Sequence, residues 1–198
     1  MGKDALNGTM GLIIAADEGV DSIGDVGRNE RVRIKEGLMW LKMCINAPVY
    51  PYAVSANEEL YLGYYLLGLL YLAGVENVCL QDRGYGLRLL VDGSERGCRK
   101  CLIRILRGVL YEEKTFQRLR MTSREALGRI RGLVTRGKDE EGMASLLCGQ
   151  WFMVQARMAG KSEDKSEGWN ENMDLARHYY TLSASQSNAK AELYLTVL

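Results

Sequence analysis

The sequence predicts an all-α protein, built from helical hairpins that stack as an α-solenoid. Its 198 residues include only two prolines, Pro48 and Pro51, so long stretches are free of residues that interrupt helices. Only two Phe and few alternating Val-rich runs argue against a sheet. Small and bulky residues recur at spacings of three, four and seven, which place them on one face of a helix. With 47% hydrophobic residues, the chain can bury a core of its own.

The helical pattern repeats along the chain. A glycine is followed three residues later by an aromatic or bulky apolar residue at Gly11 and Ile14, Gly68 and Tyr71, Gly108 and Tyr111, and Gly149 and Phe152. The last three glycines are 40 and 41 residues apart, a period typical of stacked helical hairpins. The first helix of each hairpin is predicted to carry this pattern.

A second pattern alternates with the first and predicts the second helix of each hairpin. It consists of a small residue with partners three and seven places on: Gly37, Trp40 and Cys44; Gly86, Leu89 and Gly93; Ala126, Arg129 and Leu133; Ala176, Tyr179 and Ser183. Glycine inside a helix is about 1 kcal/mol less stable than alanine, so the glycines at these positions need a structural explanation. We expect the glycines to be packing notches that let neighbouring helices approach closely.

Two of the units resemble a known family. The second unit contains Leu67, Gly68, Tyr71 and Gly74, then Asp82, Gly86, Leu89, Gly93, Gly97 and Cys101. The last contains Ala176, Tyr179, Tyr180, Ser183, Ala184, Ser187, Asn188 and Ala191. These patterns resemble the Sel-one-like repeat (SLR) family of tetratricopeptide-like helical repeat proteins, over most of residues 6–195. The resemblance implies a right-handed solenoid that serves as a scaffold or adaptor.

The predicted organisation is a single helical-repeat domain over residues 1–198, with about four hairpins. The approximate units are 6–50, 57–101, 102–139 and 140–191, followed by a short closing helix at 191–198. Polar, Gly/Ser-rich insertions at 17–29 and 160–170 are expected to be solvated loops within the first and last hairpins.

Basic residues are concentrated in one segment. Residues 96–138 hold 13 Lys and Arg against three Glu, whereas the whole chain has a formal net charge of +1. The predicted basic partner-binding surface comprises Lys100, Arg104, Arg107, Arg120, Arg124 and Arg131. Helical spacing places Lys100, Arg104 and Arg107 on one face, opposite Leu102, Leu106 and Val109. This face is either merely solvated or binds RNA, a ribonucleoprotein or an acidic protein segment.

The first functional hypothesis is a non-catalytic interaction module or adaptor that binds a protein partner through a solenoid surface. Tyr64 and Tyr71 are its candidate groove residues, since their spacing of seven could expose a stripe on the concave side. The alternative is an RNA- or ribosome-associated regulatory factor that docks through the basic segment 96–138. Both hypotheses hold if the partner is a ribonucleoprotein such as the ribosome.

The sequence offers no catalytic constellation, and we expect no enzyme activity, no metal and no cofactor. Cys98 and Cys101 form a lone C-x-x-C without a second cysteine pair, and His178 is the only histidine. We expect this pair to serve packing, although Arg99 and Lys100 could make Cys98 oxidisable. The glycines at 84 and 86, and at 128 and 132, lack the strand and lysine of a phosphate loop, so packing or a loop explains them better.

The sequence predicts a cytoplasmic protein. Five cysteines are an odd number without the spacing of a disulfide framework, and no signal-peptide pattern opens the sequence. The longest uncharged stretch, residues 60–75, is 16 residues, shorter than the roughly 20 needed to cross a bilayer. No membrane span is therefore expected, and no small-molecule substrate is evident from the sequence.

Overall fold

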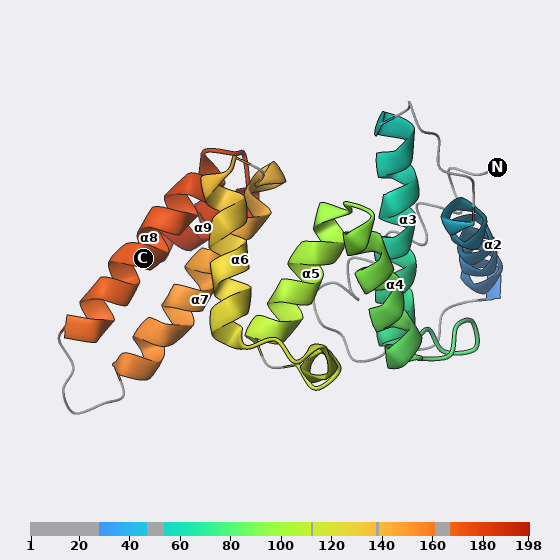
Figure 1. Cartoon of the computed structure of the whole chain (residues 1–198), viewed down its shortest axis with the longest axis horizontal. Helices are drawn as coiled ribbons and strands as arrows, with labels where there is room; N and C mark the ends of the chain where they lie inside the picture. Colours follow the sequence, from blue (N-terminus) through green and yellow to red (C-terminus); the bar gives the residue numbers. More distant parts are fainter. Residues whose placement is uncertain (1–27, 47–53, 112, 138, 161–166) are drawn as a thin grey trace. The chain divides into compact units, whose positions relative to one another are not determined.

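In the computed structural model, the regular secondary structure of the described residues is all helical, as predicted (Figure 1). It describes residues 28–46, 54–111, 113–137, 139–160 and 167–198. The α-helices are α2 (Arg28–Ile45), α3 (Val54–Ala73), α4 (Arg83–Glu95), α5 (Arg99–Leu110), α6 (Ser123–Thr135), α7 (Met143–Ala159), α8 (Glu167–Ala184) and α9 (Ala189–Thr196). Two short 3₁₀ helices are η1 (Phe116–Leu119) and η2 (Glu140–Gly142). The described residues contain no strand, only an isolated bridge between Val75 and Cys79.

The chain divides into two compact units, and the division falls between Ile105 and Leu106, inside α5. The first unit contains α2, α3, α4 and the start of α5, and the second contains the rest of α5 and α6 to α9. Helices α3 and α4 fall mainly within residues 57–101, α5 and α6 mainly within 102–139, and α7 and α8 within 140–191. Predictions for the first helix of unit 6–50 lie outside the described residues.

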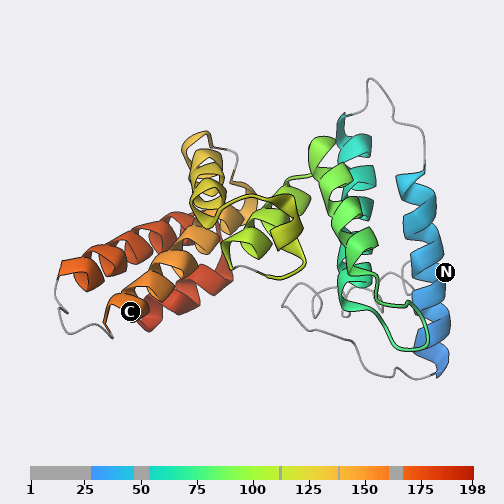
Figure 2. The same cartoon turned by 60° about the horizontal axis from the view of Figure 1, so that its bottom comes forward.

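In the first unit, α3 packs against α2 and α4, and the three helices lie side by side (Figures 1 and 2). Leu67, Leu69 and Leu70 of α3 are fully buried, because the helix is apolar around most of its circumference. Gly74 ends α3 with a φ of +74°, and a Cβ there would lie 2.8 Å from Cβ of Gln81. Only glycine satisfies both constraints, so it directs the chain into the turn before α4.

The predicted packing notches are present where α3 meets α4. A Cβ on Gly86 would lie 2.8 Å from the carbonyl oxygen of Gly68, and one on Gly68 would lie 2.9 Å from Leu90. The two helix backbones therefore approach as closely as glycine allows. Asp82 caps α4 by accepting a hydrogen bond from the backbone N–H of Tyr85 at 2.8 Å.

In the second unit, α7 packs against α6 and α8, and α9 packs against α8 (Figure 2). A Cβ on Gly149 of α7 would lie 2.7 Å from the ring of Tyr180, so this glycine is also a notch. Ser183 donates a hydrogen bond to the carbonyl of Gly142 at 2.7 Å, which ties the end of α8 to the start of α7. The predicted closing helix is α9, and its N-cap is Asn188.

Some features of the repeat pattern differ from the prediction. Gly128 and Gly132 lie inside α6, and a Cβ on either would meet nothing within 4 Å, so they are neither notches nor a loop. Trp40 and Arg129, at positions that the pattern assigns to bulky core residues, are exposed. Helix α8 begins at Glu167, so the end of the predicted loop at 160–170 is helical.

No helix among the described residues is both long enough and apolar enough to cross a bilayer.

Candidate partner-binding site

Helix α2 presents a buried stripe and an exposed apolar face. Ile34, Leu38 and Leu41 are spaced by four and three residues and are 1–7% exposed. They form the side of α2 that packs against the rest of the first unit. On other faces, Met39 and Met43 are 50% and 54% exposed. Packing against α3 needs only one apolar side of α2. The exposed methionines form additional apolar surface, so the face that carries them is a candidate contact surface.

A groove of about 670 Å³ lies along this exposed face of α2. It is lined by Lys35, Leu38, Met39, Lys42, Met43, Asn46 and Val78. The first six positions run along one side of α2 for about 16 Å, at 1.5 Å per residue. Val78 comes from the turn between α3 and α4, where the neighbouring Leu80 is 89% exposed. We call this surface the α2 groove.

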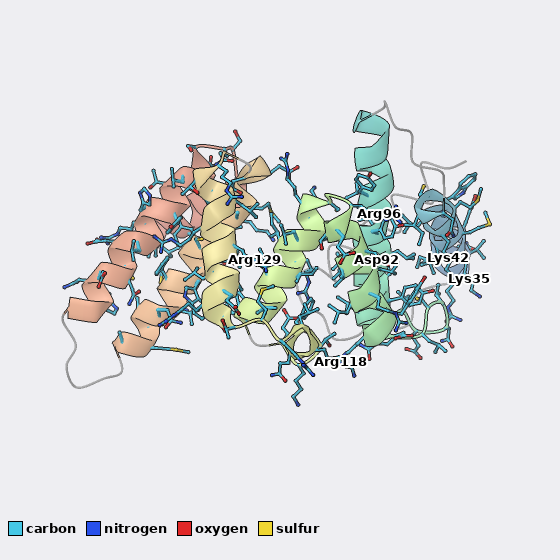
Figure 3. The ribbon with its side chains drawn as sticks, viewed as in Figure 1. Lys35, Lys42, Asp92, Arg96, Arg118 and Arg129 are labelled. Atoms are coloured by element: carbon cyan, nitrogen blue, oxygen red, sulfur yellow. The ribbon has the colours of Figure 1, made fainter. Side chains whose placement is uncertain are left out.

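The α2 groove combines methionine with positive charge. Its ionisable lining residues among those the structure describes are Lys35 and Lys42, which Figure 3 shows on α2. Asn46 donates a hydrogen bond from its amide to the carbonyl of Lys42 at 2.8 Å, and so satisfies one carbonyl at the end of the helix. Methionine adapts its shape to different apolar partners, so the groove suits an apolar segment flanked by carboxylates.

Tyr71, a predicted groove residue, lies next to this surface. Its ring is partly exposed, and the Lys42 ammonium nitrogen lies 5.9 Å from the ring centroid. The same ring packs edge-to-face with Tyr85 of α4, with 4.7 Å between centroids. Tyr71 is therefore fixed by α4 and borders the α2 groove through Lys42.

Tyr64, the other predicted groove residue, is a core residue instead. Its side chain is 7% exposed, because α3 is covered by both α2 and α4. Its hydroxyl donates a hydrogen bond to the carbonyl of Ile45 at 3.1 Å, and the Arg96 guanidinium lies 5.3 Å from the ring centroid. A partner could not reach Tyr64 without separating these helices.

The predicted basic surface is also only partly exposed. Arg104 is 6% exposed, because nearly every side of α5 is buried, including the face opposite Leu106. Lys100 and Arg107 are half-buried on the same helix. The helical spacing correctly placed these three side chains along one face, but the expectation that this face is open to solvent is wrong for Arg104.

The second half of the basic segment is more open. Arg120 follows η1 and has a φ of +52°, and Arg124 and Arg131 lie on α6; all three side chains are exposed. Arg131 also donates a hydrogen bond from Nε to the Tyr179 hydroxyl at 3.0 Å, which ties α6 to α8. Figure 3 shows two further arginines of this region, Arg118 and Arg129.

Comparisons with known proteins add no relative to this description. No protein-family model, curated protein or solved structure matches the chain. The evidence for a binding site is therefore its own contacts and charges. The resemblance to the SLR family rests on the repeat residues alone.

The C-x-x-C pair lies at the start of α5. Cys98 precedes the first residue of the helix, Cys101 is fully buried, and a Cβ on Gly93 would lie 2.6 Å from the Cys101 sulfur. A hydrogen bond from the Cys101 thiol lowers the pKa of Cys98 below that of a free thiol, helped by the backbone N–H groups of Cys101 and Lys100. The same interaction and burial raise the pKa of Cys101. Close packing and a lowered thiol pKa therefore occur together at this pair.

No three His, Cys, Asp or Glu side chains gather into a possible metal site within the described ranges.

The α2 groove was not predicted from the sequence, although α2 carries a signal for it. The apolar residues of α2 do not form one stripe: Met39 and Met43 fall outside the stripe of Ile34, Leu38 and Leu41. Such a second apolar stripe on a helix indicates a second contact. The contribution of Val78 could not be predicted, because it depends on how the turn after α3 folds against α2.

Proposed function

We propose that this protein is a non-catalytic interaction module, an SLR-like adaptor, whose α2 groove binds an acidic amphipathic helix of a protein partner. The observation that carries the proposal is the groove itself: an exposed methionine-rich surface with two lysines along one side of α2. The proposed fold is a right-handed solenoid of about four hairpins, which the notches at Gly68, Gly86 and Gly149 support.

The dimensions of the groove favour a helical ligand. A run of about 16 Å corresponds to roughly three turns of helix, long enough for apolar anchors at positions i, i+3, i+4 and i+7. Met39, Met43 and Val78 supply the apolar contacts, while Lys35 and Lys42 select carboxylates beside the anchors. A basic partner would be repelled by the same two lysines.

The experiment is fluorescence anisotropy with a labelled synthetic helix that carries Leu at four such anchor positions and Glu at the flanking positions. We expect saturable binding by the full chain, and at least tenfold weaker binding of the same peptide with Lys in place of Glu. Replacing Lys35 and Lys42 together by Glu should abolish the preference for the acidic peptide.

The matched control reverses the charge of Arg118 and Arg129, two exposed arginines on η1 and α6 (Figure 3). This variant has the same change in net charge as the lysine double variant, so it should bind the acidic peptide nearly as well as the wild type does. Equal loss in both variants would indicate a non-specific charge effect and contradict the proposal. So would equal binding of the acidic and basic peptides.

A second candidate function is binding of RNA, or of a ribonucleoprotein such as the ribosome, through the exposed arginines of η1 and α6. Arg124 and Arg131 lie on one side of α6, and Gly128 between them leaves open space. A phosphate backbone could approach this helix closely and meet both guanidinium groups.

This candidate is tested with a labelled single-stranded RNA at several salt concentrations. Binding should weaken steeply with salt and be lost when Arg124 and Arg131 are both reversed to Glu, whereas the Lys35 and Lys42 reversal should keep most of it. The two double variants therefore separate the two functions. Absence of binding at low salt would eliminate the RNA hypothesis.

A further inference from the structure

The second unit contains a cavity of about 480 Å³, formed by residues of α5, α7, α8 and α9 and by the residues that follow α5 and α9. Its volume lies within the range of about 300–1,000 Å³ that is usual for sites that bind small molecules. The residues that matter for its chemistry are Arg107, Tyr111, Met153, Arg157, Tyr180 and Tyr194.

The charged side chains that line this cavity are both positive. Two arginines, Arg107 and Arg157, line it, and none of its described lining residues is Asp or Glu. Burial raises the pKa of Tyr111, and the nearby Arg107 charge partly offsets this effect. Burial likewise raises the pKa of Tyr180, with a smaller opposing effect of Arg157. Each guanidinium group is therefore within electrostatic reach of a tyrosine hydroxyl of the cavity.

The Tyr180 hydroxyl lacks a hydrogen-bond partner within the described part of the chain. Its side chain is fully buried, with the ring stacked on Tyr194 at 5.0 Å between centroids and packed against Gly149. A buried hydroxyl without a partner is unfavourable, and such groups in native proteins require an explanation. Because its pKa is raised, this hydroxyl keeps its proton and can donate a hydrogen bond to an anion.

The remaining walls are apolar. Met153, Val154 and Val197 line the cavity together with the tyrosine rings. The Tyr194 hydroxyl accepts a hydrogen bond from the Gln150 amide at 3.5 Å, whereas the buried Tyr180 hydroxyl has no partner among the described residues. An inorganic anion would match the arginines but not these walls, whereas an uncharged apolar molecule would leave the polar groups unmatched.

We propose that this cavity binds a small carboxylate with an apolar chain, such as a saturated fatty acid of medium length. The carboxylate accepts hydrogen bonds from the Tyr180 hydroxyl and from Arg107 and Arg157, and the chain lies against Met153, Val154 and Val197. Charge, hydrogen-bond donors and apolar surface are then all matched by one ligand. This site is separate from the α2 groove and does not depend on the function proposed for it.

The test is isothermal titration calorimetry of the full chain with decanoate, below its micellar concentration. Decan-1-ol, which has the same chain without a charge, and acetate, which has the charge without the chain, are the comparison ligands. We expect decanoate to bind at one site and at least tenfold more tightly than either comparison. Equal binding of decanol would overturn the proposal, because only apolar partition would then remain. Absence of decanoate binding would also overturn the proposal. Binding of a peptide with a free C-terminal carboxylate would not rescue it in that case.

Two variants locate the site. Arg157→Gln should weaken decanoate binding about tenfold, and Arg129→Gln on the exposed side of α6 is its matched control and should leave binding unchanged. Tyr180→Phe removes only the hydroxyl, so the unliganded variant should melt no earlier than the wild type, yet the gain in Tm with decanoate should fall. If both cavity variants bind decanoate as the wild type does, the ligand lies elsewhere and the assignment is wrong.

Discussion

Two glycines in the second unit have opposite surroundings, and this contrast gives a sharp prediction about how the helices are held together. Gly149 lies inside α7, where an added Cβ would be 2.7 Å from two ring carbons of Tyr180. Gly128 lies inside α6, where an added Cβ would meet nothing within 4 Å. We expect Gly149→Ala to destabilise the protein and Gly128→Ala to stabilise it.

The magnitude follows from comparing the two variants. Both gain about 1 kcal/mol of helix propensity, so the difference between them isolates the cost of the contact at Gly149. Carbon atoms in contact lie about 3.5–4.0 Å apart, so the Tyr180 ring would have to move by about 0.8 Å or more. That ring is fully buried and stacked on Tyr194, which leaves it little freedom to yield. Overpacking of this kind costs about 1–3 kcal/mol, and we expect a difference near 2 kcal/mol.

Thermal unfolding followed by circular dichroism at 222 nm is the assay. For a chain of this size, about 2 kcal/mol corresponds to roughly 4–8 °C, with Gly149→Ala melting below the wild type and Gly128→Ala above it. A Tyr180→Leu exchange in the Gly149→Ala background should recover part of the loss, since it removes the ring from the new methyl group. If the two alanine variants melt at the same temperature, Tyr180 does not pack on Gly149 and the notch interpretation is refuted.

Four further predictions concern single side chains. Tyr64→Phe should lower the free energy of unfolding by about 1 kcal/mol in urea, because it removes only the hydrogen bond to the Ile45 carbonyl; no change would mean that the bond is absent. Asp139→Asn should cost about 2 kcal/mol in the same assay, because Asp139 accepts hydrogen bonds from two backbone N–H groups at the start of α7; a neutral effect would contradict this capping role. Alkylation of Cys98 should show a lower pH midpoint in the folded protein than in urea, as measured by mass spectrometry of tryptic peptides, because the hydrogen bond from Cys101 lowers the pKa of Cys98; an equal midpoint would exclude an activated thiol. Stability should fall as pH rises from about 9 towards 12, because burial raises the pKa of Cys148 to about 12, so that this thiol ionises in the unfolded chain before it does in the folded protein. Cys148→Ala should weaken this dependence of Tm on pH, and an unchanged slope would assign the dependence to other groups.

The helical fold could be predicted because its evidence is local. A small residue at a fixed spacing from a bulky one marks a helix face, and the contact of Gly68 with Gly86 lies at the positions that the two alternating patterns selected. Helix caps such as Asp82 are equally local, since the residue and the N–H it binds are three positions apart. These signals need no knowledge of distant parts of the chain.

The binding surfaces could be predicted only in part, because exposure depends on neighbours that the sequence does not name. Tyr64 and Tyr71 are seven residues apart on α3, yet the first is in the core and the second borders the α2 groove. The cavity of the second unit draws Arg107, Arg157 and Tyr180 from three different helices. Periodicity within one helix carries no information about such a convergence.

The basic segment is rich in Arg and Lys, but not all of these side chains add charge to the protein surface. Arg96 lies over the Tyr64 ring, Arg104 is buried, and Arg131 donates a hydrogen bond to Tyr179. A variant that reversed the buried Arg104 would test folding together with RNA binding, since an uncompensated buried charge is strongly destabilising. The informative substitutions are therefore those of exposed arginines on η1 and α6, where a loss of RNA binding could be assigned to the surface itself.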